Sequence, residues 1–210
     1  MKIKINIQIF AIALVLFLTK QIEVYAWLML FALIHELAHM CAGLILKLKP
    51  KTLEIHAFGI GIIFESFENS EKNKIIIASA GPFINIIIAI MFYFVHIKVS
   101  TIIVNTNILL AIINLVPIYP LDGGRILKSV ISLKTENKIA DEITYKVSNS
   151  LMVVLTMISS ILILIYKNIG LFLIVIYLWL IVIKENKRFN LKKRIQNVLE
   201  KQKNAWLFIN

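Results

Sequence analysis

The chain has 210 residues, of which 59% are hydrophobic, and a formal net charge of +11. This composition excludes an ordinary soluble domain and is typical of a polytopic membrane protein. The positive charge does not indicate a nucleic-acid partner, because it follows the loops between apolar segments and no recognisable reading module accompanies it. The single cysteine excludes an internal disulfide.

Six apolar segments predict an all-α membrane protein with about six transmembrane helices. They cover residues 5–18, 26–46, 75–97, 101–118, 151–166 and 169–183. The first, fifth and sixth fall short of the roughly 17–25 residues that a span needs, so these helices must extend or the bilayer must thin. With the N-terminus inside, all of the 23 Lys and Arg residues except Lys20, Lys98 and Lys167 lie on the cytoplasmic side. This distribution predicts a multi-pass protein of the cell membrane with both termini in the cytoplasm.

The N-terminus allows a second interpretation. Residues 1–4 are basic, residues 5–18 are apolar, and Val24-Tyr25-Ala26 resembles a signal-peptide cleavage site. Cleavage there would leave five spans, and sequencing the mature N-terminus distinguishes the two possibilities. If the first segment is retained, residues 1–183 form one six-helix transmembrane domain.

Two segments outside the spans have patterns of their own. Residues 47–74 alternate partly between polar and apolar, with an interruption at Gly59-Ile60-Gly61, which predicts a small membrane-associated β-ribbon. A free strand edge there could hold an extended substrate, and a purely structural loop is an equally good interpretation. Residues 184–210 form a short basic tail with apolar residues at helical spacing, which predicts an amphipathic helix lying on anionic lipid.

Residues 35–39 read His35-Glu36-Leu37-Ala38-His39, inside the second apolar segment. Ionisable residues near a bilayer midplane cost roughly 2.5–3.5 kcal/mol each on insertion scales, so they are rarely found there without a function. Residues four apart share one helix face, so His35 and His39 can bind the same metal ion. The pattern predicts a zinc site in which Glu36 is the general base toward a polarised water molecule.

A catalytic zinc site needs a third protein ligand, and Asp122 is the strongest candidate. It lies in Pro117-Ile118-Tyr119-Pro120-Leu121-Asp122-Gly123-Gly124, directly after the fourth apolar segment. The two prolines are expected to break the helix, and the two glycines to allow backbone turns that aim the carboxylate back into the bundle. Irregular backbone at membrane depth is tolerated where it lines a cavity, as a hydrolytic site requires. We therefore expect one zinc ion per chain.

Two of the amides within the apolar segments have predicted roles. Asn114, eight residues before Asp122, is a candidate donor to the oxyanion of the reaction. Asn85 is expected to form an interhelical hydrogen bond instead, an interaction that averages about 0.6 kcal/mol in membranes.

These pieces resemble the site-2 protease family of intramembrane zinc metalloproteases (peptidase family M50). The resemblance covers about residues 5–183 and rests on three motifs, at residues 35–39, 80–85 and 114–124. It is strongest to the sporulation branch of the family, whose members process a pro-sigma factor. The resemblance implies zinc ligands at His35, His39 and Asp122, a catalytic base at Glu36, and substrate or oxyanion binding by Asn114, Pro117 and Pro120. It also implies a membrane-associated protein substrate, membrane-bound inhibitor proteins as partners, and, in a spore former, a place in the membrane around the forespore.

One departure from the family and two alternative functions complete the interpretation. Many sporulation-type members carry a CBS domain after the last helix, which residues 184–210 do not provide, so the resemblance leaves ATP control open. A catalytically silent membrane scaffold of the same fold is one alternative, and the intact motif residues argue against it. A metal or ion transporter is the other, but the paired inverted repeats typical of such proteins are not visible.

Overall fold

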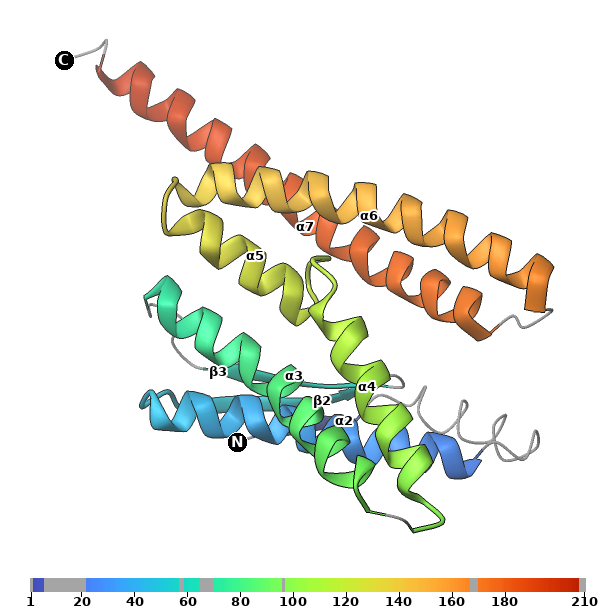
Figure 1. The fold of residues 1–210 in the computed structure, drawn as a ribbon. Helices are drawn as coiled ribbons and strands as arrows, with labels where there is room; N and C mark the ends of the chain where they lie inside the picture. The colour runs from blue at the N-terminus through green and yellow to red at the C-terminus, as the bar shows by residue number, and fades with distance from the viewer. Residues whose placement is uncertain are drawn as a thin grey trace.

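The computed structural model describes residues 2–5, 22–56, 59–64, 70–95, 97–166 and 170–207. Within these residues, six helices and a three-stranded sheet are present (Figure 1). The helices are α2 (Ile22–Ile45), α3 (Glu71–Tyr93), α4 (Ser100–Leu115), α5 (Asp122–Ser132), α6 (Asn137–Tyr166) and α7 (Gly170–Leu207). Almost all of the first predicted span lies outside the described residues.

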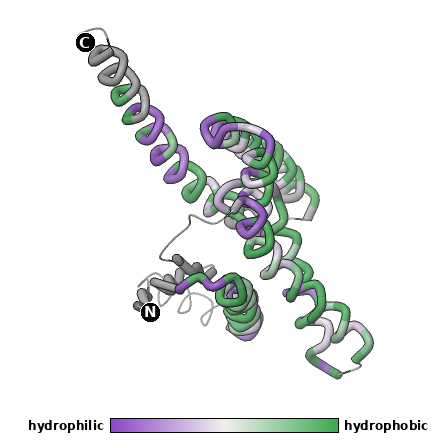
Figure 2. The backbone as a smooth tube through the Cα atoms, turned by 90° about the vertical axis from the view of Figure 1, so that its left-hand side faces the viewer, coloured by the Kyte–Doolittle hydropathy of each residue, from purple (hydrophilic) through white to green (hydrophobic). Residues whose placement is uncertain are grey.

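Two of the described helices are long and apolar enough to cross a membrane. The qualifying segments are Tyr25–Ile45 in α2 and Glu71–Tyr93, which is the whole of α3. The fourth predicted span corresponds to α4, which is apolar but shorter. Hydrophobic residues predominate along these helices in Figure 2, and many of their side chains are exposed, which suits contact with lipid. Membrane association is thus supported by the described helices, while the full count of six spans stays a prediction.

The last two helices are longer than the apolar segments that predicted them. Residues 137–150, which precede the fifth segment, form one continuous helix, α6, with it. Similarly, α7 runs without a break through the predicted domain boundary between residues 183 and 184. The end of α7 projects beyond the other elements in Figures 1 and 2. The predicted tail helix is therefore the end of α7, since no Pro or Gly interrupts residues 171–207.

The sheet consists of β1 (Lys2–Ile5), β2 (Pro50–His56) and β3 (Gly59–Phe64), in the order β1-β2-β3. Strands β2 and β3 pair antiparallel within the segment for which a ribbon was predicted. The glycines there do not interrupt the strand, because Gly59 and Gly61 both pair with residues of β2. β1 pairs parallel to β2, a contact that was not predicted. The sheet lies beside α2, with β3 the nearer of the two hairpin strands.

Two of the three buried apolar clusters among the described residues involve α4 or the loop that follows it. In one, Phe31 of α2 packs with Ile103 and Leu110 of α4. In the other, Ile118 is fully buried against α6 and α7, although it belongs to the loop between α4 and α5. Burial of apolar side chains contributes roughly 25 cal/mol per Å², so a fully buried isoleucine is a strong anchor for this loop.

Candidate metal centre

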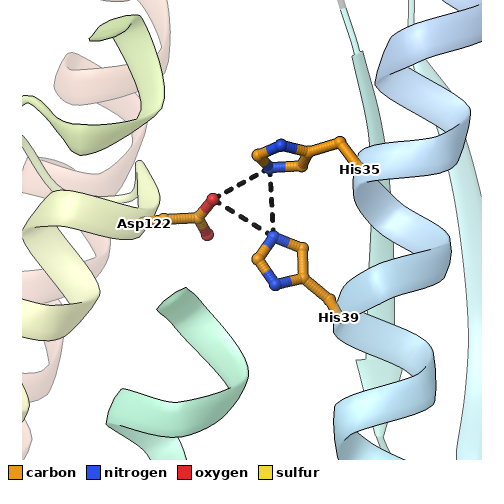
Figure 3. Close-up of side chains that lie close together, drawn as sticks. All are labelled: His35, His39 and Asp122. Carbon is orange, nitrogen blue, oxygen red and sulfur yellow. Dashed lines mark hydrogen bonds and ion pairs between the residues drawn. The ribbon is translucent and has the colours of Figure 1, made fainter. Parts of the chain in front are cut away.

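The two histidines of the H-E-x-x-H motif lie one turn apart on α2 and point in the same direction (Figure 3). Both are buried, with 3% of each residue exposed, and their Nε2 atoms are 3.1 Å apart. The imidazole planes are nearly perpendicular, at 83°. This is the arrangement that the four-residue spacing predicts for two ligands of one ion.

The carboxylate of Asp122 completes a triangle with the two imidazoles, as Figure 3 shows. Its Oδ2 atom is 3.0 Å from Nε2 of His35 and 3.1 Å from Nε2 of His39. Asp122 is buried at the first position of α5, which follows the loop of residues 116–121. The structure therefore brings together the three residues that the sequence predicted, across 83 and 87 positions of chain.

The loop before Asp122 is fixed by α6. Besides the buried Ile118, the backbone N–H of Tyr119 donates a hydrogen bond of 2.9 Å to the hydroxyl of Ser148. That hydroxyl in turn donates to the carbonyl of Thr144 at 2.7 Å. Pro117 and Pro120 lie in this loop, where α4 has ended and α5 has not begun. The position of the carboxylate thus depends on packing against a helix that contributes no ligand.

The glycines after Asp122 have a different role from the predicted one. Gly123 and Gly124 belong to the first turn of α5, and neither has a positive φ angle. A Cβ atom on Gly123 would lie 2.2 Å from the carbonyl oxygen of Leu115, and one on Gly124 would lie 2.3 Å from the backbone nitrogen of Tyr119. The prediction that they supply unusual backbone turns was wrong. They are required because the start of α5 presses against the end of α4 and the connecting loop.

A third glycine, Gly81 of α3, lies directly against the site. A Cβ atom there would be 2.4 Å from Nε2 of His39 and 2.5 Å from Nε2 of His35. Any side chain would therefore occupy the space between the helix backbone and the ligand atoms. Sequence reasoning missed this role, although Gly81 follows the small residues Ala78 and Ala80, a pattern that marks close helix approach in membranes.

The donor set fits a zinc ion. Nδ1 of His39 donates a hydrogen bond of 2.6 Å to the carbonyl of Ile77. In the neutral imidazole the proton is then on Nδ1, and Nε2 of His39 has a free lone pair. That lone pair faces Oδ2 of Asp122, which is also an acceptor, so a proton or a metal cation must lie between the two atoms. Ligands about 2.0–2.1 Å from one tetrahedral zinc ion are roughly 3.3 Å apart, close to the triangle of 3.0–3.1 Å seen here. The three atoms form a possible metal site.

Other charged groups surround the triangle. Glu36 is half-buried next to His35 and lies within electrostatic range of His35, His39 and Asp122. The guanidinium of Arg125 is 3.9 Å from Oδ1 of Asp122, one turn along α5. The carboxylate oxygen that is not aimed at the histidines therefore faces a cation. Arg125 is half-exposed, as is common for an arginine that keeps its charged group in contact with water.

Of the two amides with predicted roles, Asn85 differs from expectation and Asn114 does not. Asn114 is half-buried, and its Nδ2 atom donates to the carbonyl of Leu110 in its own helix at 3.0 Å. One N–H of that amide is thus occupied, and a substrate role for the other stays a prediction. Asn85 is fully buried, yet neither of its side-chain polar atoms has a partner among the described residues. The predicted interhelical hydrogen bond is not present there.

The fold has a close counterpart among solved structures. The site-2 protease from Methanocaldococcus jannaschii superposes with a TM-score of 0.68 at 21% identity, over 87% of this chain and 89% of that one. The chain has the fold of a site-2 protease.

Two sequence comparisons point the same way as the site-2 protease fold. The model of peptidase family M50 matches residues 96–159, which include Asp122. A protein of Synechocystis sp. that is named as a zinc metalloprotease is 29% identical over 122 residues, or 53% of this chain. The chain spans about a third of the length of that relative (32%). The two sequence matches are thus to a peptidase family and to a zinc metalloprotease, and the solved structure supports the fold.

Proposed function

We propose that this chain is an intramembrane zinc metalloendopeptidase of the site-2 type. The observation that carries the proposal is the buried triangle of His35, His39 and Asp122, with ligand atoms 3.0–3.1 Å apart. Two of these residues lie on a helix with the length and composition of a membrane span. The family matches support the same chemistry.

The residues around the triangle have distinct roles in this proposal. When bound, zinc lowers the pKa of a water molecule to about 7 and polarises the scissile carbonyl. His35, His39 and Asp122 would hold the ion. Glu36, adjacent to His35, removes the proton from the attacking water and passes it to the leaving amine. Asn114 offers its remaining amide N–H to the substrate or the oxyanion.

The substrate is proposed to be a membrane-associated regulatory protein cut near the cytoplasmic face, for which a pro-sigma factor in a spore former is the leading candidate. Pro117 and Pro120 shape the cleft beside the zinc ligands. Among the described strands β3 is an edge strand beside α2, so it offers backbone groups to an extended substrate. The same proposal includes six spans with both termini in the cytoplasm. It also includes two kinds of partner, namely membrane-bound inhibitor proteins and anionic lipid at the end of α7.

Coexpression with candidate membrane-tethered transcription-factor precursors tests the function. The wild-type chain is expected to cleave at least one precursor, and Glu36→Gln is expected to abolish cleavage while zinc stays bound, because the amide cannot accept the proton. A matched control is Glu71→Gln at the start of α3, where the carboxylate pairs with Lys74 at 2.6 Å. It should cleave as the wild type does. Full cleavage by Glu36→Gln would overturn the mechanism.

A further inference from the structure

The two histidines of the triangle differ in the environment of the ring nitrogen that is not aimed at Asp122. Nδ1 of His39 donates to the carbonyl of Ile77. Nδ1 of His35 is also buried, but it has no partner among the described residues. An imidazole that presents its Nε2 lone pair to a metal carries its proton on Nδ1. Because metal-binding histidines almost always donate that N–H to an acceptor, His35 requires one.

An acceptor without a partner is present on the neighbouring helix. Both Oδ1 and Nδ2 of Asn85 are buried without a partner among the described residues, and none of the residue is exposed. Asn85 lies four residues after Gly81, so the two share one face of α3. That face is the one on which a Cβ atom added at Gly81 would lie 2.4–2.5 Å from the histidine Nε2 atoms. The unpaired amide therefore belongs to the side of α3 that borders the metal centre.

The direction of the helices places this amide near His35 rather than His39. Ile77 contacts His39, and Gly81, one turn later, lies against both histidines, so α3 advances toward His35 as residue numbers rise. Figure 1 shows α2 and α3 running in opposite directions, in agreement with these contacts. In Figure 3 the second ring nitrogen of His35 points away from His39. It thus points along the direction in which α3 continues from Gly81 to Asn85.

We propose that Asn85 is a positioning residue for His35. Its Oδ1 atom accepts a hydrogen bond from Nδ1–H of His35 through one buried water molecule. Such a water would have three polar partners in Nδ1 of His35 and the two amide atoms of Asn85, which is the usual number for a buried water. The hydrogen bond fixes the tautomer and the ring orientation that Nε2 needs as a ligand. This inference rests on the proposed zinc site.

The test is the dissociation constant for zinc of the full-length chain in detergent micelles, measured by competition with a chromophoric chelator. Asn85→Ala is expected to weaken zinc binding by about 10- to 100-fold, the usual effect of losing such a partner. Asn85→Asp keeps an acceptor oxygen at the same position and is expected to restore affinity. Asn107→Ala is the matched control, because Asn107 is equally buried but its amide donates to the carbonyl of Ile103 within α4. If Asn85→Ala does not fold, Asn85→Leu provides the variant of similar volume without an acceptor.

Each outcome decides the proposal. Weak binding by Asn85→Ala, with rescue by Asn85→Asp and no effect of Asn107→Ala, supports it. Wild-type affinity in Asn85→Ala overturns this inference and leaves the proposed function standing. Equal losses in the Asn85 and Asn107 variants, or no rescue by Asn85→Asp, also overturn it, since packing alone would then explain the effect. A wild-type chain that binds no zinc overturns both the inference and the proposed function.

Discussion

Replacing Gly81 by alanine is expected to weaken zinc binding by roughly 5- to 150-fold. The new Cβ would lie 2.4 Å and 2.5 Å from the two histidine Nε2 atoms, whereas non-bonded carbon contacts are optimal at about 3.5–4.0 Å. Either α3 must recede or the imidazoles must turn away from Asp122. Overpacking a well-packed interior costs about 1–3 kcal/mol, and each 1.4 kcal/mol corresponds to a tenfold change in affinity. If the whole cost of overpacking opposes zinc binding, about 1–3 kcal/mol corresponds to the expected, roughly 5- to 150-fold loss of affinity.

The assay is the zinc dissociation constant of the purified chain, determined together with its melting temperature in the absence of metal. Alanine has a helix propensity up to about 1 kcal/mol better than glycine, so general unfolding of α3 is not the expected cause of the loss. Phe83→Ala is the control, because Phe83 lies two residues further along α3 and is 63% exposed. Wild-type zinc affinity in Gly81→Ala would refute the close approach of α3 to the ligands.

Three further predictions concern the support of the site. Ile118→Ala removes the fully buried anchor of the α4–α5 loop and should lower the free energy of unfolding by about 2–5 kcal/mol, measured against Leu133→Ala at an exposed position. Gly124→Ala places a Cβ 2.3 Å from the backbone nitrogen of Tyr119, so it should displace Asp122 and reduce bound zinc; a full zinc complement would contradict this. Asp141 lies in the part of α6 before the predicted span. Burial raises the pKa of its carboxyl group, but the ion pairs with Lys128 and Lys192 lower that pKa by more, so the pKa lies below the ordinary value. A depressed carboxyl pKa stabilises the fold above the unfolded-state value of about 3.9, and that stabilisation is lost as pH falls through the folded-state pKa. The melting temperature of the wild type should therefore exceed that of Asp141→Asn near neutral pH and converge with it in acid, and a pH-independent difference would exclude the ion pairs as its cause.

The meeting of His35, His39 and Asp122 was predictable because its signals are local in the sequence. His35 and His39 are held on one face by helix periodicity alone. Asp122 was identified because it is an acidic residue beside an apolar segment, in a stretch where two prolines end a helix. The sequence pattern thus indicated which residues meet, although 83 positions separate the aspartate from the nearer histidine.

Features that depend on contacts between distant elements were not predictable in the same way. Strand β1 alternates lysine and isoleucine, but its partner β2 lies about fifty residues later, and a four-residue strand has little signal of its own. The importance of Gly81 arises from the approach of one helix to another, and the sequence alone does not define that distance. The same holds for Gly123 and Gly124, whose lack of a side chain was attributed to backbone freedom rather than to close packing.

Counting zinc in the purified chain shows whether His35, His39 and Asp122 hold one zinc ion. Metal analysis of the detergent-solubilised protein should find one zinc per chain in the wild type and in Glu36→Gln. Zinc should be lost from His35→Ala, His39→Ala and Asp122→Ala, because each variant keeps only two of the three protein ligands that a catalytic zinc site needs. A wild-type chain without zinc, or an Asp122→Ala variant that keeps one zinc per chain, would show that these three residues do not hold the ion.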